Sequence, residues 1–397
     1  MIPGASGGSS ENALESDLPR HKEKTGRRVA FFGFRSGNQA ISHVMLNLMN
    51  AMVDQGVSVD LLLNKTDIPE LSRVRPEIRI VELGHGSVWY RVRALARYLE
   101  EDEPQVLYTN HKERANREAI FAKKMTGSGV HLVFRIGTTL SKALERRNAP
   151  KRFLMRTSVN YCYRRADTII ANARGVAADV SAITGIPLEE IHVVNNSTVT
   201  PTLYERALEP LDHPWLQGDG VPVVVGVGRM TRQKDFPTLF RAFARIRATR
   251  SCRLLILGEG KERGRLEQLA RELGIEADLD MPGFVANPFA YMSRASLFVL
   301  SSAWEGSPNV LIEALALGIP AVATDCHSGP RDILQGGKYG PLVPVGDVDA
   351  LTEAMLAGMT RPHPAEFLKR AAEPFHADRC AGEYLAAAGS AVAEEIF

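Results

Sequence analysis

Short apolar runs alternate with helical segments along most of the chain, and this alternation limits the possible folds more than any other feature of the sequence. Many of the runs are continuously apolar and rich in β-branched residues, as in Val223–Val227. Strands that are buried on both faces have this composition, and their alternation with helices indicates a parallel sheet covered by helices on both sides. The expected strands are 28–33, 57–63, 105–108, 130–134, 168–171, 191–194, 223–227, 253–257, 296–300 and 319–323. The sequence thus predicts an α/β fold of the doubly wound, Rossmann-like type.

The alternation is interrupted between residues 200 and 220, where Pro and Gly gather and the apolar period is lost. Such a stretch is typical of a linker, and a chain of 397 residues, 45% of them hydrophobic, is long enough for two domains. We therefore expect a Rossmann-like N-terminal domain over 27–200, a linker over 201–220 and a second Rossmann-like domain over 221–376. Residues 1–26 are polar and Gly/Ser-rich and are predicted to form a disordered tail. Residues 377–397 are Ala-rich and are predicted to be helical.

Two absences bear on where the protein works. No apolar segment near the first residue has the form of a secretory signal, and no run of about 20 apolar residues is present that would span a membrane. The four cysteines at positions 162, 252, 326 and 380 have no paired spacing, so neither a disulfide framework nor a zinc site is expected. We expect a cytoplasmic protein.

The most informative chemical motif is a pair of carboxylates, Glu305 and Glu313, which follows an expected strand. Pro308 suits the first helical position, with Ser307 as the N-cap, and Gly318 suits the residue past the helix end. The two carboxylates then flank a helix N-terminus, whose N–H groups and dipole suit a phosphate. This arrangement fits a nucleotide sugar. Spacing alone leaves a plainer alternative open, in which Glu305 is a loop charge and Glu313 a solvated helix residue.

A second cluster follows the strand expected over 223–227. Gly226 and Gly228 allow a ligand to approach the backbone, and Arg229 and Lys234 occupy the turn before the next helix. An Arg fork and a Lys point charge together suit a diphosphate leaving group. Loops also carry Arg and Lys for solubility alone, and this segment by itself does not distinguish the two explanations.

Taken together, these segments resemble the retaining family 4 glycosyltransferases, which have the two-Rossmann-domain architecture called GT-B. The matching positions are Gly228, Arg229, Lys234, Glu305 and Glu313, with seven residues between the two glutamates. The segments 257–260, 281–285, 324–334 and 338–347 also match the family. The resemblance extends from about residue 28 to the C-terminus and is densest between about 221 and 348.

The resemblance implies a retaining transferase that moves a hexose or N-acetylhexosamine from a nucleoside diphosphate sugar to a hydroxyl. Arg229 and Lys234 would stabilise the leaving diphosphate, while Glu305 would hold the sugar hydroxyls. The other implied donor-binding residues are Gly228, Gly258, Val285, Ser307, Pro308, Asn309, Val310 and Glu313, the last on the ribose. The segment 324–330 resembles enzymes that extend lipid-linked or surface polysaccharides. The family also implies that the C-terminal helix crosses back onto the N-terminal domain.

Neither a metal nor a cofactor is expected. The segments Asp278-Leu-Asp280 and Asp347-Val-Asp349 spell the Asp-x-Asp pattern that holds a divalent metal in another glycosyltransferase architecture. Two isolated acids would leave Mg²⁺ mostly to water and phosphates, and an N-cap role explains Asp347. The segment 34–38 is not a Gly-x-Gly-x-x-Gly fingerprint, so an NAD enzyme is not expected.

A basic segment, Lys142–Arg165, contains a single acid, Glu145. Its basic residues are Lys142, Arg146, Arg147, Lys151, Arg152, Arg156, Arg164 and Arg165, and aromatic and aliphatic residues lie between them. Such a segment suits an anionic membrane surface and a lipid-carried acceptor, which would make the protein peripheral to the cell membrane. A solvated basic helix is the alternative. No nucleic-acid-binding motif accompanies the segment, so nucleic acid is not an expected partner.

The sequence departs from the family on the acceptor side. Many members carry a His just past an N-terminal-domain strand, where this chain has Gly137, and the usual Gly-Gly of the first loop is reduced to a single Gly37. We assign Gly37, His111, Arg135 and Gly137 to the acceptor side, with His111 either replacing the family His or lying on the surface. Two alternatives to a transferase stay open: a sugar-nucleotide epimerase or hydrolase of the same architecture, and a non-catalytic nucleotide-sugar-binding subunit.

Overall fold

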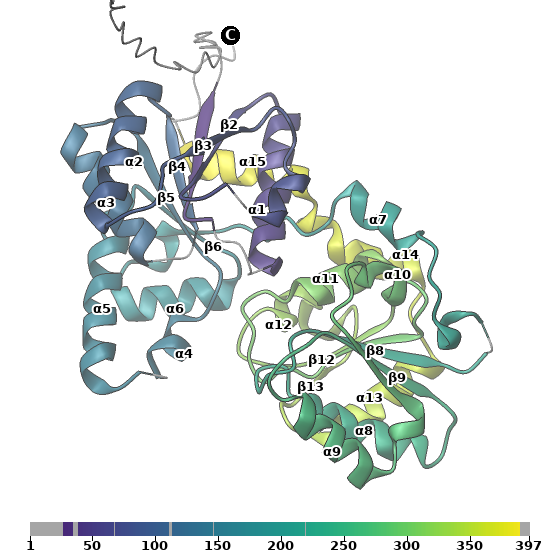
Figure 1. Ribbon diagram of the computed structural model, residues 1–397. Helices are drawn as coiled ribbons and strands as arrows, with labels where there is room; N and C mark the ends of the chain where they lie inside the picture. Colours follow the sequence, from purple (N-terminus) through teal and green to yellow (C-terminus); the bar gives the residue numbers. More distant parts are fainter. Residues whose placement is uncertain are drawn as a thin grey trace, which may run out of the picture.

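The computed structural model of the protein describes residues 27–34, 39–66, 68–110, 113–145, 147–218 and 220–389. The chain forms two lobes, each built on one parallel sheet with helices on both faces (Figure 1). The predicted α/β architecture of two Rossmann-like domains is confirmed. The tail predicted over 1–26 and two residues assigned to the acceptor side, Gly37 and His111, lie outside the described residues.

The N-terminal lobe has a seven-stranded sheet of order β3-β2-β1-β4-β5-β6-β7. Its strands are β1 (Arg28–Phe32), β2 (Ser58–Leu63), β3 (Arg79–Glu82), β4 (Val106–Asn110), β5 (His131–Ile136), β6 (Thr168–Ala171) and β7 (Ile191–Val193). Its helices are α1 (Gln39–Asp54), α2 (Val88–Asp102), α3 (Glu113–Thr126), α4 (Leu140–Glu145), α5 (Ala149–Tyr163) and α6 (Arg174–Thr184). Helices α2, α3, α5 and α6 cover one face of the sheet, and α1 covers the other.

The C-terminal lobe has a six-stranded sheet of order β10-β9-β8-β11-β12-β13. Its strands are β8 (Val223–Val227), β9 (Arg253–Leu257), β10 (Leu279–Gly283), β11 (Leu297–Leu300), β12 (Ala321–Thr324) and β13 (Leu342–Val343). Its helices are α8 (Phe236–Arg247), α9 (Arg263–Leu273), α10 (Pro288–Met292), α11 (Asn309–Ala316), α12 (Pro330–Ile333), α13 (Val348–Thr360) and α14 (Ala365–Lys369). Helices α8, α9 and α13 pack on one face, and α10, α11 and α14 on the other.

Three strands that the apolar pattern did not predict complete the sheets: β3, β10 and β13. All three lie at the edges of their sheets, where burial on both faces is not required. Strand β3 is largely exposed, β10 contains Pro282, and β13 has two residues. An edge strand lacks the continuous apolar run that identifies a central one, which is why the pattern did not reveal them.

The connections between the lobes depart from a simple linker. The stretch 201–220, which was predicted to be a linker, contains a short helix, α7 (Pro201–Ala207), and a 3₁₀ turn, Pro214–Leu216. Helix α7 forms because Pro201 suits a first turn and because Leu203 and Ala207 are buried.

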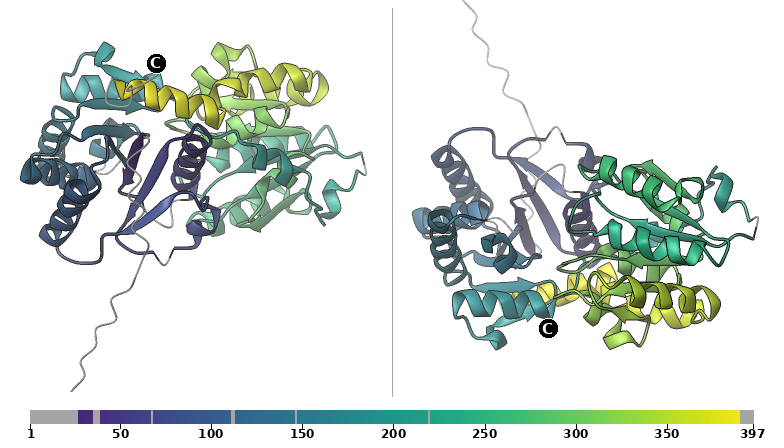
Figure 2. Two further views of the ribbon diagram at one scale, coloured as in Figure 1. Left: turned by 90° about the horizontal axis from the view of Figure 1, so that it is seen from above. Right: turned by 90° about the horizontal axis from the view of Figure 1, so that it is seen from below.

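The chain returns to the N-terminal lobe at its end. Helix α15 (Ala377–Ala387) lies across that lobe and packs on α1 through buried residues that include Cys380 and Tyr384 (Figure 2). The predicted crossover is therefore confirmed, although the described helix ends at Ala387. The outward and return crossings are adjacent, because Val199 and His376 form a parallel β-bridge.

In each sheet the strand order reverses beside the first strand, between β1 and β4 and between β8 and β11. Ligands of open α/β sheets bind outside the carboxyl ends of the strands at such reversal points. The loops after β8 and β11 are therefore the first places to look for a site in the C-terminal lobe.

Candidate functional site

Three strands of the C-terminal lobe end in glycines whose backbones are in close contact. Gly228, after β8, has a φ of +151°, and its N–H donates to the carbonyl of Leu257 (2.9 Å). Gly258, after β9, has a φ of +140°, and its N–H donates to the carbonyl of Gly283 (2.8 Å). A Cβ on Gly258 would lie 2.1 Å from the carbonyl oxygen of Gly228. Only glycine fits both the backbone conformation and this approach, which leaves the strand ends without side chains.

Lys234 and Glu305 form an ion pair at the reversal point of this sheet. The Lys234 Nζ lies 2.7 Å from Glu305 Oε1, and the two side chains are 15% and 9% exposed. Lys234 comes from the loop after β8 and Glu305 from the loop after β11, so the pair joins the two motifs that the sequence places 71 residues apart. The structure thus brings an ammonium and a carboxylate together at the place where a ligand of this sheet is expected.

Neighbouring side chains fix the position of the Glu305 carboxylate. Ser302 Oγ donates to Oε1 (2.7 Å), and Gln233 Nε2 donates to Oε2 (3.3 Å) and to the carbonyl of Trp304 (3.1 Å). Sequence reasoning missed Ser302 and Gln233. The spacing of Ser302, three residues before Glu305, was the available signal. With these bonds the carboxylate is held in one place before any ligand arrives.

Arg229 lies on the same loop as Lys234, at the other side of the turn. Its side chain is exposed, and among the described residues no hydrogen bond or ion pair of its guanidinium is found. A cation with five donors and no protein partner within the described chain is able to receive an anion without breaking an existing pair.

The loop that carries Glu305 leads into α11, which begins one residue later than the sequence suggests. Asn309 is the first helical residue and Pro308 is the N-cap, with no side-chain capping hydrogen bond. The prediction of Ser307 as N-cap and Pro308 as first helical residue is therefore wrong. Pro308 has the extended conformation (φ −75°, ψ 99°) that a cap requires, and the helix keeps its first-turn N–H groups unbonded by a cap side chain.

Glu313, one turn into α11, lines a small cavity of about 20 Å³ between the lobes. The cavity is lined by His43, Val44, Asn47, Arg73, Thr198, Thr200, Thr202, Leu203, Phe289, Asn309 and Glu313. Although the residue as a whole is partly exposed, its carboxyl group is enclosed, and burial raises its pKa to about 7 against the opposing charges of Lys234 and Arg206. The structure therefore places Asn309 and Glu313 where the two lobes meet.

The remaining residues assigned from the sequence lie around this junction. Val285 follows β10 and packs against the apolar cluster beneath α11, and Val310 is the second residue of that helix. Gly137 follows β5 and lies close to the Glu305 loop, because a Cβ on Gly306 would lie 2.6 Å from the Gly137 carbonyl oxygen. Arg135, at the end of β5, is 2% exposed and points into the protein instead of the cleft.

The four aspartates of the Asp-x-Asp segments have structural roles. Asp347 accepts from the N–H of Ala350 (2.9 Å) as the N-cap of α13, which confirms the predicted cap. Asp349 pairs with Arg245, Asp278 with Arg247, and Asp280 with His213. Within the described ranges, no group of three or more His, Cys, Asp or Glu side chains has the arrangement of a metal site.

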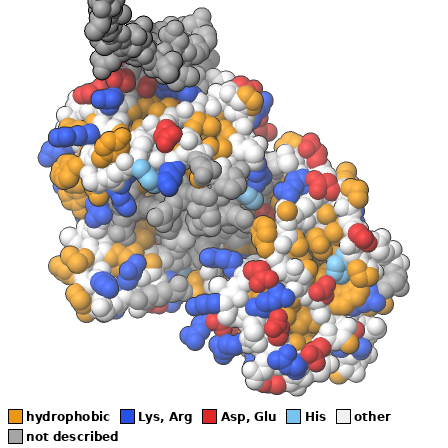
Figure 3. All heavy atoms as spheres, viewed as in Figure 1, with side chains coloured by type: hydrophobic (Ala, Val, Ile, Leu, Met, Phe, Trp, Pro, Cys, Tyr) orange, Lys and Arg blue, Asp and Glu red, His pale blue; other side chains and the backbone are white. Residues whose placement is uncertain are grey.

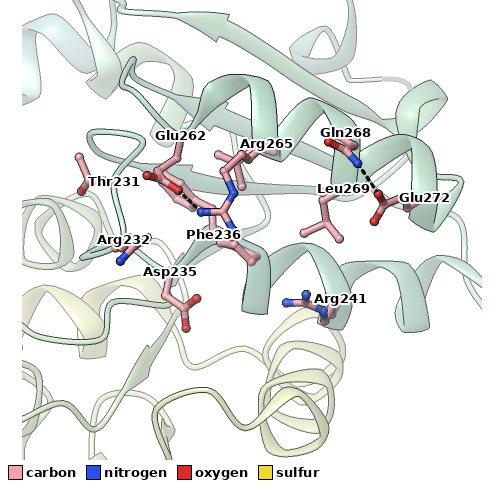
Figure 4. A pocket seen from close by; sticks show the side chains of 12 residues that line it. Thr231, Arg232, Asp235, Phe236, Arg241, Glu262, Arg265, Gln268, Leu269 and Glu272 are labelled. Carbon is pink, nitrogen blue, oxygen red and sulfur yellow. Dashed lines mark hydrogen bonds and ion pairs between the residues drawn. The ribbon is translucent and has the colours of Figure 1, made fainter.

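A cavity of about 440 Å³ lies outside this site, in a groove between α8 and α9 (Figure 4). It adjoins the outer side of the loop after β8 through Thr231, Arg232 and Asp235. Its charged groups partly neutralise each other, since Glu262 accepts from Arg265 (2.9 Å). None of the residues that contact Glu305 lines it, so its size does not identify it as the active site.

The basic segment forms α4 and α5 on the outer side of the N-terminal lobe. On α5, Lys151, Arg152 and Arg156 are exposed, and so are Phe153 (71%) and Leu154 (66%). Hydrophobic and basic side chains alternate along this edge of the lobe, at the left of Figure 3. Arg164 and Arg165 are also exposed, and they donate to the carbonyls of Thr184 and Tyr161, respectively. Among the described residues, no helix combines the length and apolar character needed to cross a bilayer.

The chain matches two protein-family models. The model "Glycosyl transferases group 1" matches residues 212–373, and "Glycosyl transferase 4-like domain" matches residues 40–197. The two matches fall on the two lobes and together take in most of the chain.

Curated relatives match part of their length. The N-acetylgalactosamine-N,N'-diacetylbacillosaminyl-diphospho-undecaprenol 4-alpha-N-acetylgalactosaminyltransferase of Campylobacter jejuni is 30% identical over 242 residues, which cover 61% of this chain and 64% of that protein. The lipopolysaccharide core biosynthesis glycosyltransferase LpsE of Rhizobium meliloti is 32% identical over 199 residues, which cover 50% of this chain and 55% of the relative. The matches thus span about half to two thirds of these two relatives.

Solved structures share the fold over nearly the whole chain. The apo form of the lipopolysaccharide outer core galactosyltransferase WaaB has a TM-score of 0.71 and 23% identity, and covers 91% of this chain and 99% of its own. HepE from Anabaena in complex with UDP has a TM-score of 0.71 and 18% identity, and the match covers 91% of this chain and 100% of the HepE chain. From its two lobes, its crossover helix and these matches, the chain belongs to the family 4 glycosyltransferases of GT-B architecture.

Proposed function

We propose that the protein is a retaining glycosyltransferase that moves a hexose or N-acetylhexosamine from a nucleoside diphosphate sugar to a hydroxyl. The observation that carries this proposal is the Lys234–Glu305 pair, held at the strand ends beside the exposed Arg229. A diphosphate bound over Gly228 would meet two cations and the N-terminus of α11, and a sugar beyond it would meet the Glu305 carboxylate. Charge that develops on the departing diphosphate is stabilised by groups already in place, which is commonly the largest contribution to catalysis.

The donor is proposed to be a UDP-sugar and the acceptor a lipid-linked or surface-polysaccharide glycan. Support for the nucleotide comes from HepE, whose structure contains UDP, and support for the acceptor from the C. jejuni relative, whose name specifies a diphospho-undecaprenol substrate. An acceptor of that kind suits the exposed basic and apolar side chains of α5, through which the protein would bind the membrane as a peripheral, otherwise cytoplasmic enzyme. Neither a metal nor a cofactor is required in this proposal, because Arg229, Lys234 and α11 supply the positive charge.

The proposal is tested by incubating the protein with a set of nucleotide sugars, each with and without a lipid-diphosphate acceptor. We expect diphosphate release that depends on the acceptor, a product with the anomeric configuration of the donor, and a rate unaffected by EDTA. Release without acceptor would favour a hydrolase, a new sugar nucleotide would favour an epimerase, and binding without turnover would favour a non-catalytic subunit.

A further inference from the structure

Arg135 is a buried cation whose described partners are all neutral. Its Nε donates to the Tyr384 hydroxyl (3.0 Å), Nη1 to Asn110 Oδ1 (3.2 Å) and Nη2 to Asn196 Oδ1 (2.7 Å). Within the described part of the chain it forms no ion pair, unlike the other buried arginine of this lobe, Arg91, which lies 2.8 Å from Glu118. Burial raises the pKa of Tyr384, so this hydroxyl stays neutral.

A buried guanidinium without a carboxylate is unfavourable for stability compared with an apolar side chain of similar size. The planar guanidinium does, however, fix the relative positions of several hydrogen-bond acceptors at once. Here the fork joins three separate parts of the chain: the end of β4, the segment after β7, and helix α15. Arg135 therefore holds these three parts of the chain in a fixed relative position.

The hydrogen bonds continue from this junction into the donor site. Asn196 receives the Arg135 bond on its Oδ1 and donates from its Nδ2 to Asn309 Oδ1 (2.8 Å). Thr198 Oγ1 also donates to Asn309 Oδ1 (3.3 Å). Because Asn309 is the first residue of α11, the N-terminal lobe holds the start of the helix that is proposed to face the diphosphate.

The absence of a side chain at position 137 belongs to the same arrangement. A Cβ on Gly137 would lie 3.1 Å from Arg135 Nη1 and 3.3 Å from Asn172 Nδ2, so a larger residue would press on both. The Gly137 carbonyl, in turn, lies against Gly306 of the Glu305 loop. The two lobes therefore contact each other at two neighbouring places: at the Asn196–Asn309 hydrogen bond next to Arg135, and where Gly137 lies against the Glu305 loop.

We propose that Arg135 is a positioning residue for the transfer reaction: through Asn196 and Asn309 it couples the seating of the N-terminal lobe to the geometry of the first turn of α11. This inference rests on the proposed function only for its kinetic consequence. The coupling itself is a property of the folded chain, and it is measurable without turnover.

The test compares Arg135→Met and Arg135→Lys with a control, Arg91→Met, which removes the other buried arginine that the structure describes in the same lobe; Arg91 lies on α2 and has no described hydrogen bond to α11. Amide hydrogen exchange is followed in the peptide that contains residues 309–316. Arg135→Met should speed exchange there by roughly 10-fold or more, as expected when bonds to a charged donor are lost. Arg135→Lys should restore part of the protection, and Arg91→Met should leave this peptide unchanged. Equal exchange in wild type and Arg135→Met, or equal acceleration in Arg91→Met, would overturn the proposal.

Kinetics provide the second measurement, and Asn196→Ala keeps the test usable if Arg135→Met does not fold. Either variant should lower kcat roughly 10- to 100-fold and should weaken UDP binding by a smaller factor, because Arg229 and Lys234 keep their own contacts with the diphosphate while the first turn of α11 loses its position. The double variant Arg135→Met/Asn309→Ala should lose no more than the worse single variant, as for residues acting in one chain. Additive losses, or a kcat that is unchanged, would contradict the coupling. If the wild type transfers no sugar, the proposed function fails, but the exchange experiment still decides this inference.

Discussion

At the scale of single residues, Arg229 and Lys234 are proposed to act on the same diphosphate, but their side chains have different environments in the structure. Lys234 is held by Glu305, whereas Arg229 is exposed. Replacing either by Ala should lower kcat by about 10²-fold or more, as for loss of one strong donor to a developing charge. Arg229→Lys should also lose activity, because the fork is lost. Steady-state kinetics with a cleavable donor measure this, and near-normal turnover in both Ala variants would refute the assignment.

The two glutamates should separate in a binding experiment. Glu313→Gln is expected to weaken binding of a nucleoside diphosphate, because the proposed contact of Glu313 with the ribose would be made whether or not a sugar is attached. Glu305→Gln should leave that affinity nearly unchanged and should impair turnover of the nucleotide sugar. Calorimetry with UDP alone distinguishes them, and equal losses would mean that their roles are misassigned.

Glu313 also has a consequence for stability. Its pKa is raised from 4.5 to about 7, so the folded state binds the proton more tightly than the unfolded state. The contribution of this group to the free energy of unfolding is therefore full below pH 4.5, is lost as the pH rises from 4.5 to about 7, and stays lost above that. The Tm of Glu313→Gln should accordingly rise relative to wild type across this window. A Tm difference that is independent of pH would contradict the raised pKa.

At the scale of elements, α5 carries the proposed membrane contact. The triple variant Lys151→Gln, Arg152→Gln and Arg156→Gln should abolish sedimentation with anionic vesicles at low salt, since each cation near such a surface contributes about 1 kcal/mol. Donor binding should be unaffected, because the proposed donor site lies in the other lobe. A control with three exposed cations of the C-terminal lobe changed to Gln, namely Arg271, Arg361 and Arg370, should sediment like wild type. If the wild type and the triple variant both stay in the supernatant, a soluble acceptor is favoured.

The elements also show which parts of the fold are readable from sequence. Central strands such as β8 and β11 are buried on both faces and give continuous apolar runs, so their positions and the loops after them were predictable. Three edge strands, β3, β10 and β13, were not predictable, although the edge strand β7 was. The start of α11 was not predictable either, because an X-Pro pair suits both a cap and a first turn. The ion pair of Lys234 with Glu305 follows from their strand ends. The path through Asn196 to Asn309 does not, because an Asn carries no periodicity and its partner lies 113 residues away.

At the scale of the whole molecule, the four cysteines report on the integrity of both lobes. All four thiols are buried, two in each lobe. Burial raises the pKa of Cys326 to about 11 and that of Cys380 to about 12, so little thiolate is present at neutral pH. An aromatic disulfide reagent at pH 8 should therefore react slowly with the native protein and with four thiols after denaturation. Rapid reaction of one or more thiols in the native state would indicate a lobe that opens in solution.

The two crossings between the lobes, at Val199 and His376, lie side by side, and this adjacency bears on how the C-terminal lobe could be exchanged between proteins. The Val199 N–H donates to the Phe375 carbonyl (3.0 Å), and the Ala377 N–H donates to the Val199 carbonyl (3.0 Å). The C-terminal lobe is thus an insertion whose two ends are neighbours, and α15 belongs structurally to the lobe that precedes it. We expect a segment of this kind to be exchangeable between relatives, because both of its junctions lie at one location. Under the proposed function, such an exchange would transfer the preference for a nucleotide sugar together with the C-terminal lobe, while the N-terminal lobe of the receiving protein would still select the acceptor.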